Sequence, residues 1–369
     1  MVDYASAGVD IEAGDRAVEL MKSAVAKSHN QTVFGESGGF AGLIDASALK
    51  GMKRPLLASS TDGVGTKVAI AQAMDIHDTI GQDLVGMVVD DIVVMGAKPL
   101  LMTDYIATGK VHPERIADIV RGVAEACAAV DCPLIGGETA EHPGLMAPDD
   151  YDIAGAATGV VDEEKVLGAH RVTVGDVIIG MASSGLHSNG YSLVRRIISD
   201  AGWKLDRDVP EFGRTLGEEL LEPTRLYTGV LLDMIDALPD GAVKALSHIT
   251  GGGLGANISR VIPRGFVATV DRESWVVPPV FSVLGELGGV KWDALEETFN
   301  LGVGMVAIVD EEAADEALGY LASKEMEPWV LGQVELSSES LQLATGQRLV
   351  QGAKGVDGGS ALLTGSYRA

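Results

Sequence analysis

The sequence predicts an α/β (α+β) protein built from two domains, and three observations support this prediction. The length of 369 residues is enough for two domains of ordinary size. Short apolar runs of strand length alternate with longer stretches in which apolar residues recur every three to four positions. The composition, with 46% hydrophobic residues and 47 glycines, is that of a globular enzyme.

The elements follow from these patterns in chain order. Asp15 and Asp78 stand where two of the helices need N-terminal caps, and Pro113 suits the first turn of another. The expected helices are 15–28, 78–95, 113–130, 217–236, 279–287 and 311–324, with one more from Tyr191. The expected strands are 55–58, 99–108, 134–135, 153–161, 177–181, 265–270, 303–309 and 329–335.

The domain boundary is expected near residues 168–172, because a second block of alternating strands and helices starts there. The first domain is therefore 1–170 and the second 171–348. Residues 349–369 are rich in glycine and lack periodicity, which predicts a flexible tail with no part in the fold.

The charge excludes some partners. With 28 basic and 53 acidic residues, the formal net charge is −25, which repels nucleic acid and anionic lipid. An anionic substrate would need a local group of donors, for which the candidates are Lys67, Lys110, His187, Arg195 and Arg196. The two cysteines lack the spacing of a zinc site, and no signal peptide or apolar run of membrane length is found. We therefore expect a cytoplasmic protein.

The most informative stretch is 59–67, Ser-Ser-Thr-Asp-Gly-Val-Gly-Thr-Lys, which follows the apolar run 55–58. Its glycines allow the backbone to approach an anion, Lys67 supplies a positive charge, and Asp62 offers an oxygen ligand for Mg²⁺. The order of residues is not that of a Walker A loop. The stretch indicates a phosphate and metal site on a different architecture.

Three acidic residues lie on the predicted helix 78–95. Asp83 and Asp90 are seven positions apart and share one helix face, to within about 20°, whereas Asp91 lies about 80° from Asp83. One interpretation is a solvated helix edge. The other is a Mg²⁺ site shared with Asp62, because buried carboxylates need a cation or donors to offset their charge.

Two further polar segments follow predicted strands. Residues 136–144 contain Glu138 and Glu141 next to glycines, which favours metal ligands or a general base, or else a polar turn with a helix cap. Residues 104–110 bring Asp104 and Lys110 to the end of another strand.

Residues 183–190, Ser-Ser-Gly-Leu-His-Ser-Asn-Gly, lie between a strand and a helix. Backbone N–H groups at a helix N-terminus bind phosphate, so this segment predicts a phosphate cradle, with a serine-rich cap as the alternative. It lacks the Gly-x-Ser-x-Gly pattern of a hydrolase nucleophile. Residues 251–256 match a dinucleotide-binding fingerprint with Asp271 downstream, but Pro263 leaves too short a helix, which disfavours that interpretation.

Taken together, these motifs resemble the aminoimidazole ribonucleotide synthetase family, also called phosphoribosylformylglycinamidine cyclo-ligase. The resemblance runs from residue 4 to about 345. It is carried by the segments 4–11, 38–40, 60–67, 77–85, 104–110, 136–141, 183–193 and 248–253.

The resemblance implies an activity and a fold. The activity is the ATP-dependent ring closure of formylglycinamidine ribonucleotide to 5-aminoimidazole ribonucleotide, with ADP and phosphate released, through an iminophosphate, in purine biosynthesis. The fold has two α/β domains, and the N-terminal sheets of two subunits pair into a barrel in a homodimer. The first domain would bind ATP and dimerise, and the second would bind the substrate phosphate.

The resemblance also implies site residues. Asp62 and Asp91 would hold Mg²⁺ on the phosphates, and the loop 35–42 would close over the nucleotide. The residues assigned to ATP are Gly38, Gly39, Phe40, Asp62, Gly63, Gly65, Thr66, Lys67, Asp104, Gly137 and Glu138. Those assigned to the substrate phosphate are Ser184, Gly185, His187, Ser188 and Asn189, and those assigned to catalysis are Lys110, Glu141 and His248.

His248 stands where other members of the superfamily tend to carry Asp, and an imidazole there suits proton transfer during ring closure. Two rival interpretations remain. One is another enzyme of the superfamily, such as selenophosphate synthetase or the formylglycinamide ribonucleotide amidotransferase. The other is a nucleotide-binding regulator without turnover, which ADP release in the presence of substrate would exclude.

Overall fold

The computed structural model describes residues 8–35, 39–337, 343–352 and 358–368. It divides into two compact units, each described by itself below. Unit 1 comprises residues 1–92 and 97–165, and unit 2 comprises residues 93–96 and 166–369. In the described ranges no helix is both long enough and apolar enough to cross a membrane.

Unit 1 is built on a four-stranded sheet among its described residues. The strand order is β3 (Pro55–Gly63), β6 (Tyr151–Asp162), β4 (Lys98–Thr108) and β5 (Leu134–Glu141). β6 is antiparallel to both of its neighbours, whereas β4 and β5 are parallel and are joined through α4 (Pro113–Ala129). A short pair, β1 (Val33–Phe34) and β2 (Leu43–Ile44), and α2 (Val68–Met74) complete the unit.

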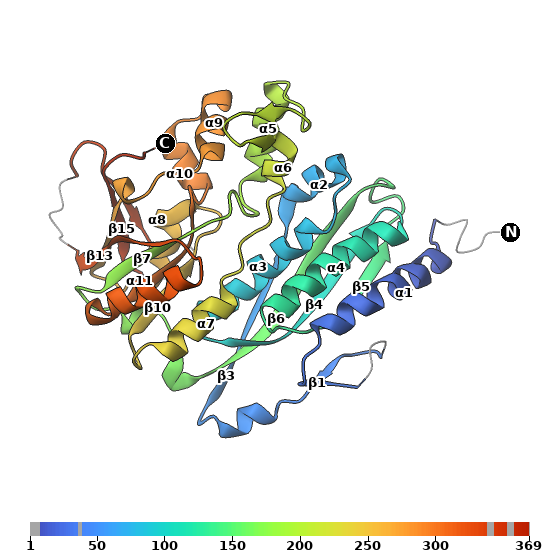
Figure 1. Cartoon of the computed structure of the whole chain (residues 1–369), viewed down its shortest axis with the longest axis horizontal. Coiled ribbons are helices and arrows are strands. Elements are labelled where there is room, and N and C mark those ends of the chain that lie inside the picture. The colour runs from blue at the N-terminus through green and yellow to red at the C-terminus, as the bar shows by residue number, and fades with distance from the viewer. Residues whose placement is uncertain (1–7, 36–38, 338–342, 353–357, 369) are drawn as a thin grey trace. The chain divides into compact units, whose positions relative to one another are not determined.

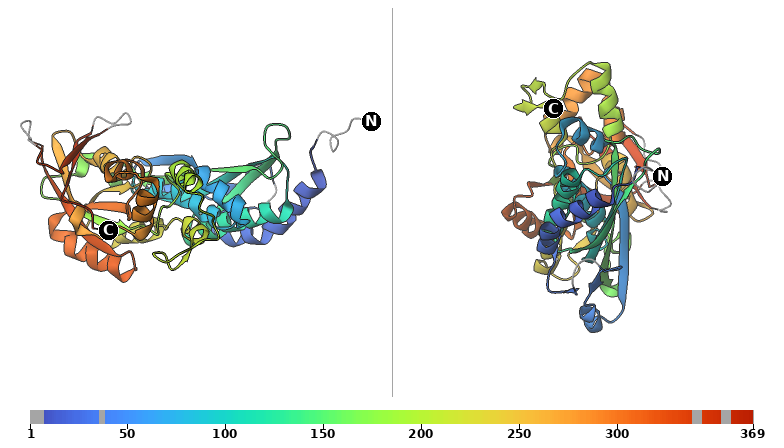
Figure 2. Two further views of the ribbon diagram at one scale, coloured as in Figure 1. Left: turned by 90° about the horizontal axis from the view of Figure 1, so that it is seen from above. Right: turned by 90° about the vertical axis from the view of Figure 1, so that its right-hand side faces the viewer.

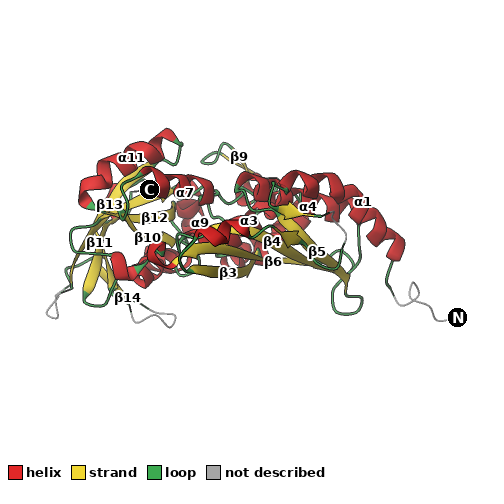
Figure 3. Cartoon of the chain, turned by 90° about the horizontal axis from the view of Figure 1, so that it is seen from below, coloured by secondary structure: helices red, strands yellow, loops and turns green. Residues whose placement is uncertain are grey.

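Helices cover one face of this sheet (Figure 3). They are α1 (Ile11–Ser28), α3 (Thr79–Val93) and α4, of which α1 and α4 lie side by side (Figures 1 and 2). α1 begins earlier than the periodicity predicts, because Asp10 rather than Asp15 is its N-cap and accepts a 3.0 Å hydrogen bond from Ala13 N–H. The sheet face away from the helices exposes small and polar side chains together with Leu57 and Tyr105.

Unit 2 contains a sheet of seven strands among the described residues. Their order is β10 (Val243–His248), β12 (Val303–Val309), β7 (Val177–Ala182), β13 (Pro328–Leu336), β11 (Phe266–Asp271), β15 (Ser360–Thr364) and β14 (Arg348–Gln351). Every residue of β12 is buried, which marks it as the centre of the core. A two-stranded ribbon, β8 (Asp208–Val209) and β9 (Arg214–Thr215), lies apart from this sheet.

The helices of unit 2 are mostly short: α5 (Tyr191–Asp200), α6 (Leu216–Leu220), α7 (Thr228–Ala237), α8 (Gly253–Ile258), α9 (Pro279–Gly288), α10 (Trp292–Thr298) and α11 (Ala314–Ser323). The single helix expected over 217–236 is wrong. It is divided into α6 and α7, because Pro223 cannot donate a helical hydrogen bond and disfavours helical geometry in the residue before it.

The prediction that residues 349–369 have no part in the fold is wrong. β15 is parallel to β11 and its first four residues are buried, while β14 pairs with β15 at the edge of the sheet. Tyr367 then donates a 2.6 Å hydrogen bond to the buried Glu296. The glycines around these strands hide the pattern, and a buried strand of five residues is too short for periodicity to reveal.

The dinucleotide-binding interpretation of 251–256 is excluded by the topology. It would need β10 and β11 to be parallel neighbours across a helix, as in a βαβ unit. In the sheet, β12, β7 and β13 lie between these two strands.

Candidate functional site

A row of acidic residues and glycines crosses the sheet of unit 1. Asp62 of β3 pairs with Gly155 of β6, Gly155 with Asp104 of β4, and Asp104 with Gly137 of β5. Paired residues on neighbouring strands direct their side chains to the same face, so Asp62 and Asp104 share a face with one glycine between them. Asp62 is exposed, and its Oδ1 accepts a 2.7 Å bond from Gly63 N–H.

Asp104 is half-buried, and its Oδ2 atom is buried. Burial raises its pKa to about 7, and its charge in turn helps to raise the pKa of the buried Cys127 thiol on α4, where burial is the larger cause. Among the described residues, Asp104 Oδ2 has no hydrogen-bond partner. A Cβ on Gly137 would lie 1.7 Å from Asp104 Oδ1, so only glycine leaves room for this carboxyl group. This position does not support the assignment of Asp104 to ATP, which stays a prediction.

Replacing Asp104 by Asn should stabilise unit 1 in a pH-dependent way. The carboxyl group keeps its proton up to about pH 7 in the folded chain but loses it near pH 3.8 when unfolded. The stability of the native protein therefore falls as pH rises between these values, by up to about 4 kcal/mol. Urea unfolding should show Asp104→Asn more stable than the parent at pH 8 and close to it at pH 4.5.

The control for this experiment is Asp206→Asn, because Asp206 is exposed in unit 2. It should change stability little at either pH. A difference between Asp104→Asn and the parent that is the same at both pH values would contradict the titration of Asp104.

The two carboxylates predicted to share a face of α3 are buried. Asp83 and Asp90 are both 0% exposed, which contradicts the interpretation as a solvated edge, whereas Asp91 is exposed. The cation that offsets Asp83 is Lys67, whose Nζ lies 2.9 Å from Asp83 Oδ1 in a fully buried pair. Lys67 is therefore a counter-ion inside unit 1, and this position does not support its assignment to the nucleotide.

The two residues assigned to Mg²⁺ from the sequence differ in exposure from the buried Asp83 and Asp90. Asp62 and Asp91 are both exposed. No group of three or more His, Cys, Asp and Glu side chains that could hold a metal ion is found in the described ranges. Mg²⁺ in phosphate sites needs only one or two carboxylates, with phosphate and water oxygens completing its shell. These two residues therefore fit a Mg²⁺ ion brought with a nucleotide better than a resident metal ion.

Three of the sequence motifs meet at a cavity of about 710 Å³ in unit 1. They are the segment 8–12 before and at the start of α1, the pair Gly109–Lys110 after β4, and Glu141 at the end of β5. Lys110 is exposed there and has no ion pair with any described residue. It is the basic residue in the described lining of this cavity, so an anion would find its charge available.

Glu141 joins two walls of this cavity. Its Oε2 accepts a 2.7 Å hydrogen bond from Asp10 N–H, and its Oε1 accepts a 2.6 Å bond from Val111 N–H. Both oxygens are therefore occupied by backbone donors.

The remaining residues assigned to ATP lie on or near the ends of strands in unit 1. Glu138 on β5 is exposed, as are Gly65 and Thr66 in the turn that leads to α2, while Gly63 is half-buried. Gly39 and Phe40 are exposed, and Gly38 lies outside the described residues.

In unit 2, two predicted motifs follow strands that end on the same side of the sheet. β7 and β10 both run antiparallel to β12, which lies between them, so the loops that follow them emerge together. Met305 of β12 pairs with His248 on one side and with Met181 on the other. The loops are in contact, because Gly251 N–H donates a 3.0 Å hydrogen bond to Asn189 Oδ1. The structure thus brings the segments 183–190 and 248–253 into one site.

The loop 183–190 leads into α5, whose N-cap is Gly190 and has no side-chain cap. The serine-rich cap considered above is therefore not formed. Ser188 is instead buried, and its hydroxyl has no hydrogen-bond partner in the described part of the chain. Ser184 Oγ donates a 2.6 Å bond to Pro223 O. A buried hydroxyl at the start of a helix suits an oxyanion.

His187 gives this loop its shape. Its φ of +58° is unusual for a residue other than glycine, and its side chain is 1% exposed. Its Nε2 accepts a 3.2 Å bond from Ser184 N–H, which places the ring proton on Nδ1 and makes the imidazole neutral. His187 therefore supports the loop without supplying a positive charge.

Three residues of this site were missed by the sequence reasoning. Tyr227 donates a 2.7 Å bond from its hydroxyl to Ala182 O, and Asn300 donates a 2.9 Å bond to Gly185 O. Gly304 lies against Tyr227 and His187, where a Cβ would be 1.9 Å from the Tyr227 hydroxyl oxygen. Only the glycine-rich run 302–304 beside Asn300 could have indicated them, since the contacts join segments far apart in the chain.

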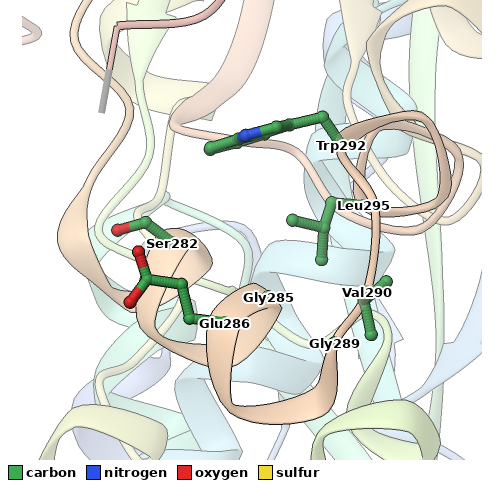
Figure 4. Close-up of a pocket in the computed structure, with 7 residues that line it drawn as sticks. All are labelled: Ser282, Gly285, Glu286, Gly289, Val290, Trp292 and Leu295. Carbon is green, nitrogen blue, oxygen red and sulfur yellow. The ribbon is translucent and has the colours of Figure 1, made fainter.

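A smaller cavity of about 370 Å³ lies elsewhere in unit 2, between α9 and α10. Trp292 covers it on one side, and Ser282 and Glu286 face it from α9 (Figure 4). None of the residues assigned from the sequence lines it. It therefore does not belong to the candidate site.

Comparison with known proteins identifies both domains of this chain and its fold. The family models of AIR synthase related proteins match residues 44–161 with the N-terminal domain and residues 173–343 with the C-terminal domain. Solved structures share the fold at low identity. E. coli HypE, a hydrogenase maturation protein, is 20% identical with a TM-score of 0.60 over 87% of this chain and 90% of its own. HypE in complex with ATP is 19% identical, with a TM-score of 0.60 over 98% and 97%.

The two domains thus define an AIR synthase related protein. Curated relatives narrow this class. The phosphoribosylformylglycinamidine cyclo-ligase of Alkaliphilus oremlandii is 47% identical over 334 residues, which are 90% of this chain and 97% of the relative. That of Shouchella clausii is 48% identical over 332 residues, or 90% and 95%. The chain belongs to the phosphoribosylformylglycinamidine cyclo-ligase family.

Proposed function

We propose that this chain closes the imidazole ring of formylglycinamidine ribonucleotide with the consumption of ATP. The products are 5-aminoimidazole ribonucleotide, ADP and phosphate, in purine biosynthesis. The observation that carries the proposal is the identity of 47% over nearly the full length of a named cyclo-ligase. The meeting of the family's motifs at one cavity in unit 1 and at one loop pair in unit 2 supports it.

The reaction begins with the transfer of the γ-phosphoryl group of ATP to the formyl amide oxygen, which gives an iminophosphate and ADP. The amidine nitrogen then attacks the same carbon, and phosphate leaves. An amide oxygen is a poor leaving group and a phosphate is a good one, so the protein's task is to position the reactants and to neutralise charge.

Asp62 and Asp91 would hold Mg²⁺, which neutralises phosphate charge when bound. Their exposure on the strand end and on α3 suits this role. Lys110 faces the cavity of unit 1 with its charge available, which supports a contact with an anionic group of a reactant. HypE in complex with ATP shares this fold, which agrees with the use of a nucleotide.

The substrate phosphate would lie on the loop 183–190. The buried Ser188 hydroxyl and the N-terminus of α5 supply donors, and Asn189 holds the loop to Gly251. His248 is the last residue of β10 and the first residue of the segment 248–253. We assign it to proton transfer during ring closure.

We further propose a cytoplasmic homodimer. The sheet face of unit 1 that the helices leave uncovered exposes Leu57 at 67% and Tyr105 at 39%, among small residues of β3 and β6. A second copy packed there would bury an apolar patch that a monomer leaves in water. Cys127 and Cys132 are free thiols, which suits a reducing compartment. Light scattering should give the mass of a dimer.

The deciding experiment is an ADP-release assay with Mg-ATP, with and without formylglycinamidine ribonucleotide. We expect release that depends on the substrate and is matched one-for-one by 5-aminoimidazole ribonucleotide. ATP binding without this turnover would favour another enzyme of the superfamily, and selenide would be the next substrate to test. Binding without turnover on any substrate would favour a regulator.

A further inference from the structure

The carboxylate of Glu141 lies at the junction of two separate wall segments of the unit 1 cavity. One segment, 8–12, comes from the N-terminal end of the described chain, and the other, 109–111, connects β4 to α4. Glu141 belongs to neither segment, since it ends β5. Its two oxygens reach one backbone N–H in each, at 2.7 Å for Asp10 and 2.6 Å for Val111.

This arrangement differs from that of a general base. A base needs a lone pair directed at the proton that it removes. Here each carboxylate oxygen accepts one short, charge-assisted bond from a backbone amide and keeps a second lone pair, so the two bonds fix the orientation of the carboxylate between the two segments. Each bond ties one wall segment to the end of β5, in addition to the bonds that hold Gly109 to Asp150 O and Lys110 O to the Thr108 hydroxyl.

The two segments carry groups that matter for the site. Asp10 is the N-cap of α1, so its position fixes where that helix begins. Lys110 lines the cavity, and Val111 follows it in the chain. The bond from Val111 N–H to Glu141 therefore holds the backbone next to Lys110. The carboxylate thus joins the two wall segments and holds the backbone from which the Lys110 side chain extends.

We propose that Glu141 is a positioning residue, which clamps the segments 8–12 and 109–111 together around the cavity and holds Lys110 toward the substrate, and that it is not the catalytic base. This replaces the role that the sequence suggests for Glu141. The effect on turnover rests on the proposed function, whereas the clamp itself does not.

The test compares Glu141→Gln, Glu141→Asp and the control Glu125→Gln, in which an exposed glutamate of α4 receives the same change. Gln keeps the shape but has one acceptor oxygen for two donors, and Asp keeps the charge but is too short to reach both amides. The first readout is amide hydrogen exchange in the full-length protein. Peptides that cover Asp10 and Val111 should exchange their amide hydrogens at least 10-fold faster in both Glu141 variants. In the control, their exchange rate should equal that of the parent. Peptides from β12 of unit 2 serve as the internal reference.

The second readout is turnover of formylglycinamidine ribonucleotide across pH. A positioning role predicts that KM rises about 10-fold or more in both Glu141 variants. It also predicts that kcat changes less than KM and that the acidic limb of the pH profile is kept. Amide exchange that stays at the parent rate would overturn the proposal. So would a fall of 10²-fold or more in kcat for Glu141→Gln, with loss of the acidic limb and with Glu141→Asp still active. If the substrate is not turned over at all, the ring-closure proposal fails, and amide exchange still decides the clamp.

Discussion

Replacement of Lys67 by Met should lower the free energy of unfolding of unit 1 by about 3–5 kcal/mol. The Lys67 ammonium and the Asp83 carboxylate are both 0% exposed and lie 2.9 Å apart. Removal of the cation leaves the Asp83 carboxylate, on the buried face of α3, without the charge of Lys67. Its neighbours there, such as Leu84, are fully buried. Urea unfolding followed by circular dichroism measures the loss.

Two comparisons show whether the loss arises from the stranded charge. The double variant Lys67→Met with Asp83→Asn removes both charges and should recover a large part of the stability, because replacing both partners costs less than removing one. Lys53→Met removes a cation that pairs with Glu164 at 2.9 Å on the surface, where the side chains are 78% and 57% exposed, and should change the stability little. A double variant as unstable as Lys67→Met alone would refute this explanation.

The Lys67 pair also shows what the sequence could and could not predict about the site. The sequence placed Asp83 and Asp90 on one helix face and required a cation to offset buried carboxylates. It assigned that cation to Mg²⁺, because a lysine sixteen residues earlier gave no sign that its side chain turns back into the core. Spacing along one helix can be read from periodicity, whereas a contact between a turn and a helix depends on packing that no local pattern records.

The same distinction holds for the fold. The α/β character and long strands such as β4 and β12 follow from apolar runs and helical periodicity, and the sequence predicts them well. β15 was missed because its strand is short, and its burial comes from pairing with β11, almost a hundred residues earlier. The seven-strand order of unit 2 mixes parallel and antiparallel neighbours, and local patterns do not determine such an order.

The sequence motifs indicate the segments of the site but not the residues that support them. The loop 183–190 and the run 248–253 were predicted separately, and the bond between Asn189 and Gly251 shows that they form one structure. Tyr227 and Gly304, which support His187 in its unusual conformation, belong to no motif of their own. Their importance follows from the close packing around them.

Gly304→Ala should destabilise unit 2 by about 3 kcal/mol and raise the KM for formylglycinamidine ribonucleotide 10-fold or more. The new Cβ would lie 1.9 Å from the Tyr227 hydroxyl oxygen and 2.7 Å from His187 Cε1. Neither side chain can move freely, because Tyr227 is 0% exposed and bonded to Ala182 O, and His187 is 1% exposed and bonded to Ser184 N–H. Displacement of His187 would distort the loop that is proposed to hold the substrate phosphate.

Two further variants separate this clash from the general effect of replacing a glycine. Gly319→Ala on α11, where nothing lies within 4 Å of the new Cβ, should be neutral or stabilise by about 0.5–1 kcal/mol, because alanine favours the helix. Tyr227→Phe removes the atom nearest to the new methyl group, so adding it to Gly304→Ala should recover part of the lost stability, although Tyr227→Phe alone loses a hydrogen bond. Effects that simply add in this double-mutant cycle would show that the Tyr227 hydroxyl is not the group that Gly304 accommodates.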